Sequence, residues 1–309
     1  MFPAFEDVFM FNSVDLAPRL DCGGRPLLLD RPRIMGVLNL TPDSFFDGGR
    51  LADGDGALRA ALQMVEDGAD IIDVGGESTR PGAAAVSAQE EIDRVLPLIE
   101  RLAAASPVPI SIDTSKPEVM RAAVGAGAGL INDVWGLRRE GALAAAADLG
   151  VPVCLMHMQG EPGSMQADPQ YGDVVAEVQR FLADRVFVCE LAGIVRSRLL
   201  VDPGFGFGKT LQHNVELMGA LSTLSSGLPP LVVGVSRKSM VGAITGRPLE
   251  GRLVGSVVAA VLAAQRGAAI LRVHDVAATR DGLAVLASLP PRTSPPKLQS
   301  KTPRWGDED

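Results

Sequence analysis

The 309-residue sequence contains few cysteines, few histidines and no long uncharged apolar segment. Its three cysteines, Cys22, Cys154 and Cys189, are far apart and form no CxxC pair, which argues against a disulfide framework and a zinc site. The three histidines form no HExxH motif, so a tightly bound transition metal is not expected. We expect a reduced, cytoplasmic protein.

Membranes and nucleic acids are not expected as partners. No segment approaches the roughly 20 uncharged apolar residues that a membrane-spanning helix needs. The N-terminal residues include Glu6, Asp7 and Asp15 and lack a basic region, so they do not resemble a signal peptide. The net charge is −8 at pH 7, and an acidic chain repels a polyphosphate backbone. A small anionic substrate is still possible, because one basic pocket can override the net charge.

Aromatic residues make up only 4% of the chain, whereas alanine and glycine are abundant, which favours close helix-on-strand packing. Short apolar runs alternate with Ala-rich amphipathic segments, and the runs are hydrophobic almost throughout, as in strands buried on both faces. Eight strands are predicted, at Arg33–Leu38, Asp70–Val74, Pro109–Ile112, Gly129–Ile131, Val151–Met156, Leu199–Val201, Leu231–Val235 and Ala269–Val273.

Helical patterns lie between these strands. The clearest are Gly56–Asp67, Ala88–Ala104, Lys116–Ala126 and Tyr171–Ala192, and Ser115 is a candidate cap for the third. Eight strand–helix units in about 255 residues predict an α/β fold, a single-domain (β/α)8 TIM barrel. A doubly wound open sheet is the alternative, but it usually has fewer strands, and no GxGxxG motif follows the first strand.

The predicted barrel spans residues 33–288. Residues 1–32 are predicted to form a leader and a segment that covers the bottom of the barrel. Residues 289–309 are rich in proline, serine and charge, so a disordered tail is predicted there.

Polar residues follow every predicted strand at its carboxyl end, where the strands of a barrel meet at one mouth. Helix capping explains part of this pattern, including Ser115 and Asp275. It does not explain Lys238, Arg272 and His274, which are cations at sites where helix N-termini already carry partial positive charge. Barrels of this type commonly bind phosphate after strands seven and eight, so we predict an anion site there.

Two other features have ordinary explanations. The GFGFGKT segment at 204–210 is not a Walker loop, because Pro203 stands where GxxxxGK[ST] requires glycine. A Gly-rich barrel loop is the better interpretation. His157 follows an apolar strand and is either a buried, orienting histidine or a reactive one, and Met156 is either core or pocket wall.

Together, the strand ends resemble the dihydropteroate synthase family over about residues 33–288. The matching segments are GVLNLTPDSFFDGG (36–49), DVGGESTRPGA (73–83), SIDTSKPEV (111–119), IND (131–133), VCLMHMQG (153–160), VDPGFGFGK (201–209), VGVSRKSM (233–240) and RVHDV (272–276). The resemblance implies a TIM barrel that transfers a dihydropterin-methyl group from its diphosphate ester to the amine of p-aminobenzoate. Phe46 departs from the family pattern, where a small polar residue is more usual.

The resemblance also implies the roles of individual residues. The pterin diphosphate would contact Thr79, Asp113, Asn132, Met156, Asp202, Lys238, Arg272 and His274. The p-aminobenzoate, or a sulfonamide mimic, would lie against Phe45, Pro81, Phe207, Lys238 and Ser239. The implied catalytic residues are Asp47, Arg80, Asp113, Lys238 and Arg272, and Asn39 would bind Mg²⁺. Family members are usually homodimers, so a homodimer is expected.

Two other functions fit part of the pattern. A barrel methyltransferase that binds a methylated folate would share the pterin pocket, but it needs neither Arg272 and His274 nor the TPDSF segment. A non-catalytic pterin-binding paralogue would be expected to lose loop motifs. The residues Asn39, Asp47, Thr79 and Arg80 are all present. Release of diphosphate that depends on p-aminobenzoate distinguishes the synthase from both.

Overall fold

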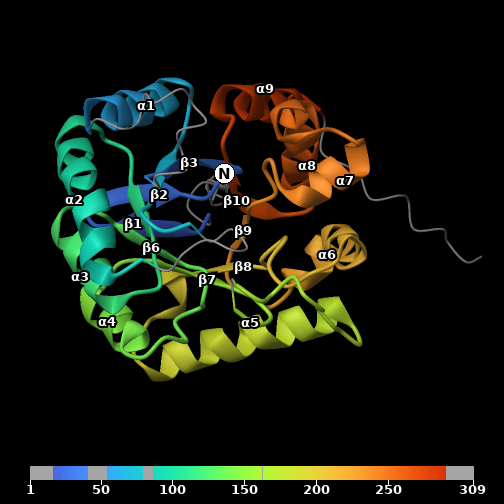
Figure 1. Ribbon diagram of the computed structural model, residues 1–309, viewed down its shortest axis with the longest axis horizontal. Helices are drawn as coiled ribbons and strands as arrows, with labels where there is room; N and C mark the ends of the chain where they lie inside the picture. Colours follow the sequence, from blue (N-terminus) through green and yellow to red (C-terminus); the bar gives the residue numbers. More distant parts are fainter. Residues whose placement is uncertain (1–16, 41–53, 79–85, 162, 290–309) are drawn as a thin grey trace, which may run out of the picture.

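The computed structural model describes residues 17–40, 54–78, 86–161 and 163–289. Within them, eight parallel strands form a closed barrel in the order β10-β3-β4-β5-β6-β7-β8-β9 (Figure 1). The strands are β3 (Arg33–Asn39), β4 (Ile71–Gly75), β5 (Ile110–Asp113), β6 (Leu130–Asp133), β7 (Val153–Met156), β8 (Leu199–Asp202), β9 (Leu231–Val233) and β10 (Ala268–Val273). The predicted (β/α)8 barrel is therefore confirmed, and each predicted strand overlaps its observed counterpart.

The helices surround the barrel as an outer ring (Figure 1). They are α1 (Gly54–Glu66), α2 (Ala88–Ala105), α3 (Pro117–Gly125), α4 (Ala142–Leu149), α5 (Val174–Leu191), α6 (Leu211–Leu224), α7 (Ser239–Thr245), α8 (Leu253–Gln265) and α9 (Val276–Ala287). The outward-facing aliphatic side chains of the strands pack against the inner faces of these helices in one large core. None of the helices in the described ranges has the length and apolarity needed to cross a membrane.

The prediction that Ser115 caps α3 is wrong. Lys116 occupies the cap position, and no side chain caps the helix there. Pro117 is the first helical residue, and since proline has no N–H group, the start of the helix has one unpaired donor fewer. The Ser115 side chain is buried, and the neighbouring Thr114 Oγ1 accepts a hydrogen bond from Lys116 N at 3.3 Å.

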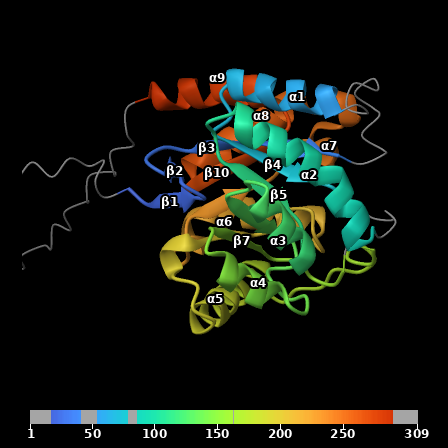
Figure 2. The same ribbon diagram turned by 90° about the vertical axis from the view of Figure 1, so that its left-hand side faces the viewer.

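A two-stranded antiparallel hairpin, β1 (Arg19–Cys22) and β2 (Arg25–Leu28), lies against one end of the barrel (Figure 2). Its buried residues Leu20, Cys22 and Leu27 pack with inward-facing side chains from the amino-terminal halves of the barrel strands. The fit is close at Gly129, where an added Cβ would lie 2.1 Å from the carbonyl oxygen of Cys22. The hairpin therefore closes the bottom of the barrel and leaves the opposite mouth for polar groups.

Candidate active site

The strand register brings the polar residues at the mouth into one row. Asn39 pairs with Gly75, Gly75 with Asp113, and Asp113 with Asn132. Because paired residues of a parallel sheet face the same side, these side chains lie next to one another. The predicted carboxyl-end residues are therefore neighbours in space although they lie far apart in sequence.

Arg272 is the centre of a buried hydrogen-bonded network. From β10 its Nε donates to Asp73 Oδ2 at 2.7 Å and its Nη2 donates to Asp113 Oδ2 at 2.6 Å. Asn132 Nδ2 also donates to Asp73 Oδ2, at 3.3 Å. Burial alone would lower the pKa of Arg272, but the charges of Asp73 and Asp113 raise it above its ordinary value. The guanidinium is therefore permanently charged and links β10 to β4 and β5.

The pKa of the Asp113 carboxyl is unusually high. Burial raises the pKa of its carboxyl to about 7, the charge of Arg272 opposes this rise, and the charges of Asp73 and Glu91 add to it. The carboxyl therefore changes its protonation near neutral pH. Perturbed groups of this kind gather at functional sites, which supports the predicted role of Asp113.

A second charged group lies beside this network. Lys238 Nζ donates to the carbonyl oxygen of Phe205 and lies 4.8 Å from the centre of the Phe207 ring. Burial lowers the pKa of Lys238 to about 8, although the charge of Asp202 opposes this. Burial also raises the pKa of Asp202, whose Oδ1 accepts from Gly204 N at 2.7 Å. Asp202 and Lys238 therefore stabilise each other's charged forms in a place where water is scarce.

The structure has a smaller excess of positive charge at the mouth than the sequence predicts. Arg272 already has two carboxylate partners from the protein. Burial and the charges of Arg272 and Arg237 together lower the pKa of His274 to about 4, so His274 is neutral at pH 7. The prediction that His274 is a cation is therefore wrong in this structure. A neutral imidazole still offers one N–H to an anion, so its predicted role as a diphosphate contact stays a prediction.

Asp275 occupies the N-cap position of α9, but its side chain makes no capping hydrogen bond, because a bidentate ion pair takes its carboxylate instead. Arg237 Nε donates to Asp275 Oδ2 at 3.0 Å, and Arg237 Nη2 donates to Oδ1 at 2.5 Å. Arg237 has a φ of +58°, a conformation that costs a non-glycine residue about 1 kcal/mol. The ion pair, together with the hydrogen bond from Arg237 N to Ser256 Oγ at 2.9 Å, stabilises this backbone immediately before Lys238.

Asn39, the predicted metal ligand, lies at the mouth of the barrel, and its metal-binding role stays a prediction. A Cβ on Gly75 would lie 3.4 Å from Asn39 Oδ1 and 3.8 Å from Asp113 Oδ2, so both oxygens face the same space. Among the described residues, no group of three histidine, cysteine or acidic side chains could hold a metal ion. A single amide oxygen fits Mg²⁺, which commonly takes few protein ligands and completes its shell with waters and substrate phosphates.

The remaining predicted contacts fall into two groups. Met156 is buried in an apolar cluster beside Phe207, and Ser239 is exposed at the first residue of α7. The five residues predicted on the first two loops lie outside the described residues; they are Phe45, Asp47, Thr79, Arg80 and Pro81.

Sequence reasoning missed Asp73, because it considered only residues that follow the strands. Asp73 lies inside β4, is completely buried, and bonds both Arg272 and Asn132. A single carboxylate within the apolar segment IIDVG was the available signal, since a buried carboxylate needs a partner.

A buried acidic pair around Lys116 was also missed. Lys116 Nζ donates to Glu91 Oε2 at 2.5 Å and to Glu77 Oε2 at 2.8 Å, and Glu91 is completely buried. Glu77 Oε1 accepts from Val86 N at 3.0 Å. Glu77 therefore connects the end of β4, the start of α2 and the start of α3. Its position in the GGESTRPG segment pointed to the mouth but not to these partners.

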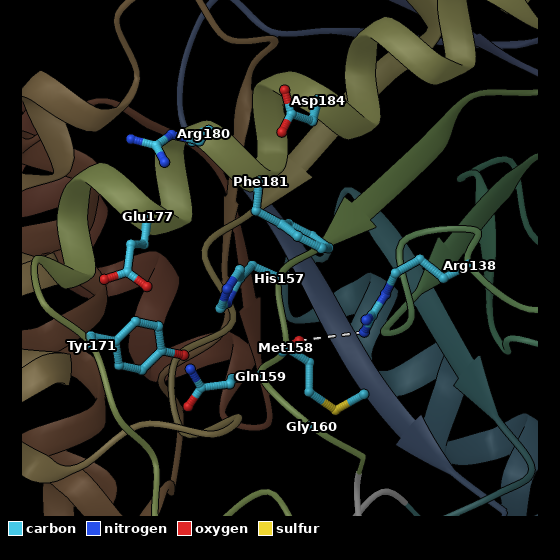
Figure 3. A pocket seen from close by; sticks show the side chains of 10 residues that line it. All are labelled: Arg138, His157, Met158, Gln159, Gly160, Tyr171, Glu177, Arg180, Phe181 and Asp184. Carbon is cyan, nitrogen blue, oxygen red and sulfur yellow. Dashed lines mark hydrogen bonds between the residues drawn. The ribbon is translucent and has the colours of Figure 1, made fainter.

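A cavity of about 420 Å³ lies apart from this network, between α5 and the segment that follows β7 (Figure 3). Figure 3 shows His157 in its wall between Phe181 and Gln159, with Arg138 on the far side. None of its lining residues is a predicted substrate contact. His157 is buried, and its Nδ1 lies 2.9 Å from Lys209 Nζ.

Comparison with known proteins assigns the chain to a family. Residues 35–274 match the family model for pterin binding enzymes. The dihydropteroate synthase of Escherichia coli strain K12 is 51% identical over 268 residues, which cover 87% of this chain and 95% of that relative. The chain belongs to the dihydropteroate synthase family. The family is thus the one that the strand-end segments resemble, and its members are transferases of folate biosynthesis.

Solved structures of the family have the same fold. The Xanthomonas albilineans dihydropteroate synthase with 4-aminobenzoic acid is 57% identical, with a TM-score of 0.83 over 89% of this chain and all of that one. The same enzyme in complex with 7,8-dihydropteroate is 55% identical, with a TM-score of 0.80 over 88% of this chain and 100% of that one. These relatives are synthases, which favours this function over the methyltransferase and the non-catalytic paralogue.

Proposed function

We propose that this chain transfers the dihydropterin-6-ylmethyl group from its diphosphate ester to the amine of p-aminobenzoate and releases diphosphate. One observation carries the assignment of roles: Arg272 joins Asp73 and Asp113 at the same mouth as Asp202 and Lys238. The relatives that bind 4-aminobenzoic acid and 7,8-dihydropteroate support the two halves of this substrate pair.

The pterin lies, in this proposal, against Asp113, Asn132, Asp202 and Lys238. The edge of a pterin presents both donors and acceptors, and two carboxylates, one amide and one ammonium complement them. All four side chains are largely buried, so a ring that lacks these atoms would leave buried polar groups unpaired. Sites of this type discriminate by about 10⁴-fold or more.

The diphosphate lies above the pterin, near Arg272 and His274. Two of the N–H groups of Arg272 donate to Asp73 and Asp113, and a guanidinium has five N–H groups, so further donors can face the substrate. His274 contributes a neutral N–H. Stabilising the charge of the departing diphosphate lowers the barrier to C–O cleavage.

Bond cleavage leaves the methylene carbon electron-poor, and the pterin ring delocalises its positive charge. Ionised Asp113, beneath this carbon, stabilises the charge electrostatically. The neutral amine of p-aminobenzoate then attacks the methylene, and its proton leaves to solvent. Because the amine itself is the nucleophile, no covalent intermediate on a serine or cysteine is needed.

Mg²⁺ is part of the proposal, with Asn39 as its protein ligand. When bound, the ion neutralises charge on the substrate diphosphate. Removal of divalent ions with a chelator is expected to abolish turnover, and Mg²⁺ is expected to restore it. Full turnover in the chelator would contradict this part of the proposal.

We also propose that the protein is a homodimer and that a sulfonamide competes with p-aminobenzoate. Exposed aliphatic side chains gather on α7 and α8, including Ile244, Val254 and Val258, and Val254 is 72% exposed. A second copy that covers these side chains removes apolar surface from water. Sedimentation of the Val254→Lys variant is expected to show a monomer, and an unchanged mass would place the contact elsewhere. The cytoplasmic location stays a prediction.

The decisive test of the proposed reaction is the release of diphosphate by purified protein supplied with the pterin diphosphate, p-aminobenzoate and Mg²⁺. The proposal expects release only when p-aminobenzoate is present, with dihydropteroate as the second product. Release that does not depend on p-aminobenzoate, or no release, would contradict it.

A further inference from the structure

Lys209 is a buried lysine that none of the predicted roles includes. Only 3% of its surface is exposed, and it lies in the segment between β8 and α6. Its Nζ lies 2.9 Å from His157 Nδ1, 2.9 Å from the carbonyl oxygen of Gly204 and 3.0 Å from that of Phe207. Burial lowers the pKa of Lys209 to about 7, although the charge of Asp202 opposes this. In its charged form the ammonium has three N–H donors, and these three acceptors satisfy it completely.

Lys209 binds the carbonyl oxygens of Gly204 and Phe207, and Phe205, whose carbonyl oxygen binds Lys238, lies between them in the sequence. Phe205 O accepts the hydrogen bond from Lys238 Nζ, and the Phe207 ring lies beneath the same ammonium. Phe207 N also donates to Gly204 O at 3.1 Å, which closes the turn. The conformation of residues 204–207 therefore sets where the Lys238 ammonium lies.

His157 fixes the direction of the Lys209 ammonium. Burial and the charge of Lys209 together lower the pKa of His157 to about 2, so the imidazole is neutral. Because Lys209 donates to Nδ1, the imidazole proton lies on Nε2. The ring meets Phe181 of α5 edge-on, with centroids 4.8 Å apart, in the cavity wall that Figure 3 shows. Packing against α5 thus holds the acceptor in place.

We propose that Lys209 is a positioning residue, and that its ammonium, oriented by His157, holds the turn at residues 204–207 in the shape that directs Lys238 at the substrates. Lys209 contacts neither substrate in this proposal, which rests on the proposed function of Lys238. It also assigns His157 the orienting role.

Lys209→Met tests the proposal directly, because methionine has a similar length but no donor. Its KM for p-aminobenzoate and its dissociation constant for a free pterin are each expected to rise about tenfold, the equivalent of one lost hydrogen bond. This variant removes the Lys209 donor from His157 Nδ1 and from the carbonyl oxygen of Phe207, while Gly204 O keeps its bond from Phe207 N. Because it can fail to fold, His157 supplies a second, matched pair of variants.

His157→Asn and His157→Leu are that pair. The Asn side-chain oxygen can take the place of Nδ1 as the acceptor for Lys209, whereas Leu has a similar volume and no acceptor. Both variants lose the imidazole and its contact with Phe181. If His157 only packs against Phe181, the two variants should therefore weaken the substrate affinities equally. The proposal predicts that H157L weakens both substrate affinities about tenfold, as K209M does, and that H157N stays within about threefold of the original protein.

Two results would overturn the inference: unchanged affinities in folded H157L, or equal weakening in H157N and H157L. Circular dichroism at the assay temperature confirms that each variant is folded. The free pterin affinities are measured by titration without turnover. They therefore decide the inference even if the original protein releases no diphosphate, a result that would count against the proposed function instead.

Discussion

At the amino-terminal end of the barrel, the β1–β2 hairpin covers the opening with Leu20, Cys22 and Leu27, which pack on other apolar side chains. At the carboxyl-terminal end, Arg272 and Asp73 are part of a buried layer of charged groups. Both layers are buried in the same barrel, but burial of apolar surface stabilises the fold, whereas burial of ion pairs contributes little or nothing.

The amino-terminal end of the barrel therefore contributes to stability, and the carboxyl-terminal end contributes to chemistry. Replacing a buried ion pair by well-packed apolar residues is often neutral or stabilising, so stability alone does not explain the charged layer. Charges that are already fixed and dehydrated, by contrast, are what a site needs to stabilise charge in a transition state. Changes at the mouth should therefore affect turnover, and changes at the bottom should affect unfolding.

The largest effect is expected for Arg272→Met. Turnover should fall about 10³-fold, because a donor to the leaving group is lost. The variant should also lose about 3 kcal/mol of unfolding free energy, since Asp73 and Asp113 lose their counter-charge. Adding Asp73→Asn should restore part of the stability but none of the turnover, measured by urea denaturation and diphosphate release. Turnover within tenfold of the original would remove Arg272 from the mechanism.

Gly129→Ala tests the bottom of the barrel. Its Cβ would lie 2.1 Å from the Cys22 carbonyl oxygen, so the hairpin must shift, at an expected cost of about 3 kcal/mol. Gly125→Ala is the matched control, because nothing lies within 4 Å of its Cβ, and its effect should stay within about 1 kcal/mol. In both variants kcat should be unchanged at temperatures where the protein is folded. Equal unfolding free energies would show that the hairpin is not held as described.

A pH profile tests the charged layer more finely. Since the pKa of Asp113 is raised to about 7 and ionised Asp113 is the active form, kcat/KM for the pterin diphosphate should rise through that pH. Below it, each pH unit should cost about tenfold. Asp73→Asn removes a negative neighbour and should move this limb to lower pH. A flat profile between pH 5 and 8 would contradict the role of Asp113.

The contribution of Asp113 to the free energy of unfolding should fall as pH rises, whereas kcat/KM should rise. The folded carboxyl has a raised pKa, so between about pH 4 and 7 the native state binds more protons there than the unfolded state. This contribution to stability therefore falls as pH rises. Asp113→Asn removes it and should make the slope more positive by up to about 1.4 kcal/mol per pH unit. An unchanged slope in urea denaturation at pH 5 and 6 would contradict the raised pKa.

The smallest effect is expected for Glu77→Gln. The amide oxygen can still accept from Val86 N, and Lys116 keeps Glu91 as its partner, so the loss is one ion pair with partly exposed side chains. The expected change in kcat/KM is about threefold, since such pairs contribute about 1 kcal/mol or less. A loss of 100-fold would show that Glu77 has a direct part in the reaction.

The barrel and the positions of its strands were predictable because each strand is an apolar run of near-uniform hydrophobicity. Asn39, Asp113, Asn132 and Asp202 were predictable as neighbours because each lies at the last or second-to-last position of a strand of one barrel. Their mutual contacts were not, since these depend on register and on side-chain direction across the barrel. Asp73 was missed because it lies inside β4 and not after the end of the strand.

The sequence predictions were wrong or incomplete where a side chain's partners or charge depend on neighbours that the sequence does not show. Asp275 could cap α9 or pair with Arg237, and only the structure shows that the ion pair prevails. The charge of His274 depends on burial and on nearby arginines, which sequence does not reveal. Lys209 was part of a segment explained as a Gly-rich loop, so its three acceptors went unnoticed.

The central claim is that the buried charges at the carboxyl end of the barrel bind the pterin ring. Calorimetric titration of a free pterin into the original protein, Lys238→Ala and Gly125→Ala tests it most directly. Lys238→Ala should weaken binding by about 30-fold or more, because a charged hydrogen-bond donor is lost from a buried site, while Gly125→Ala should bind as the original does. Equal affinity in all three proteins would contradict the claim.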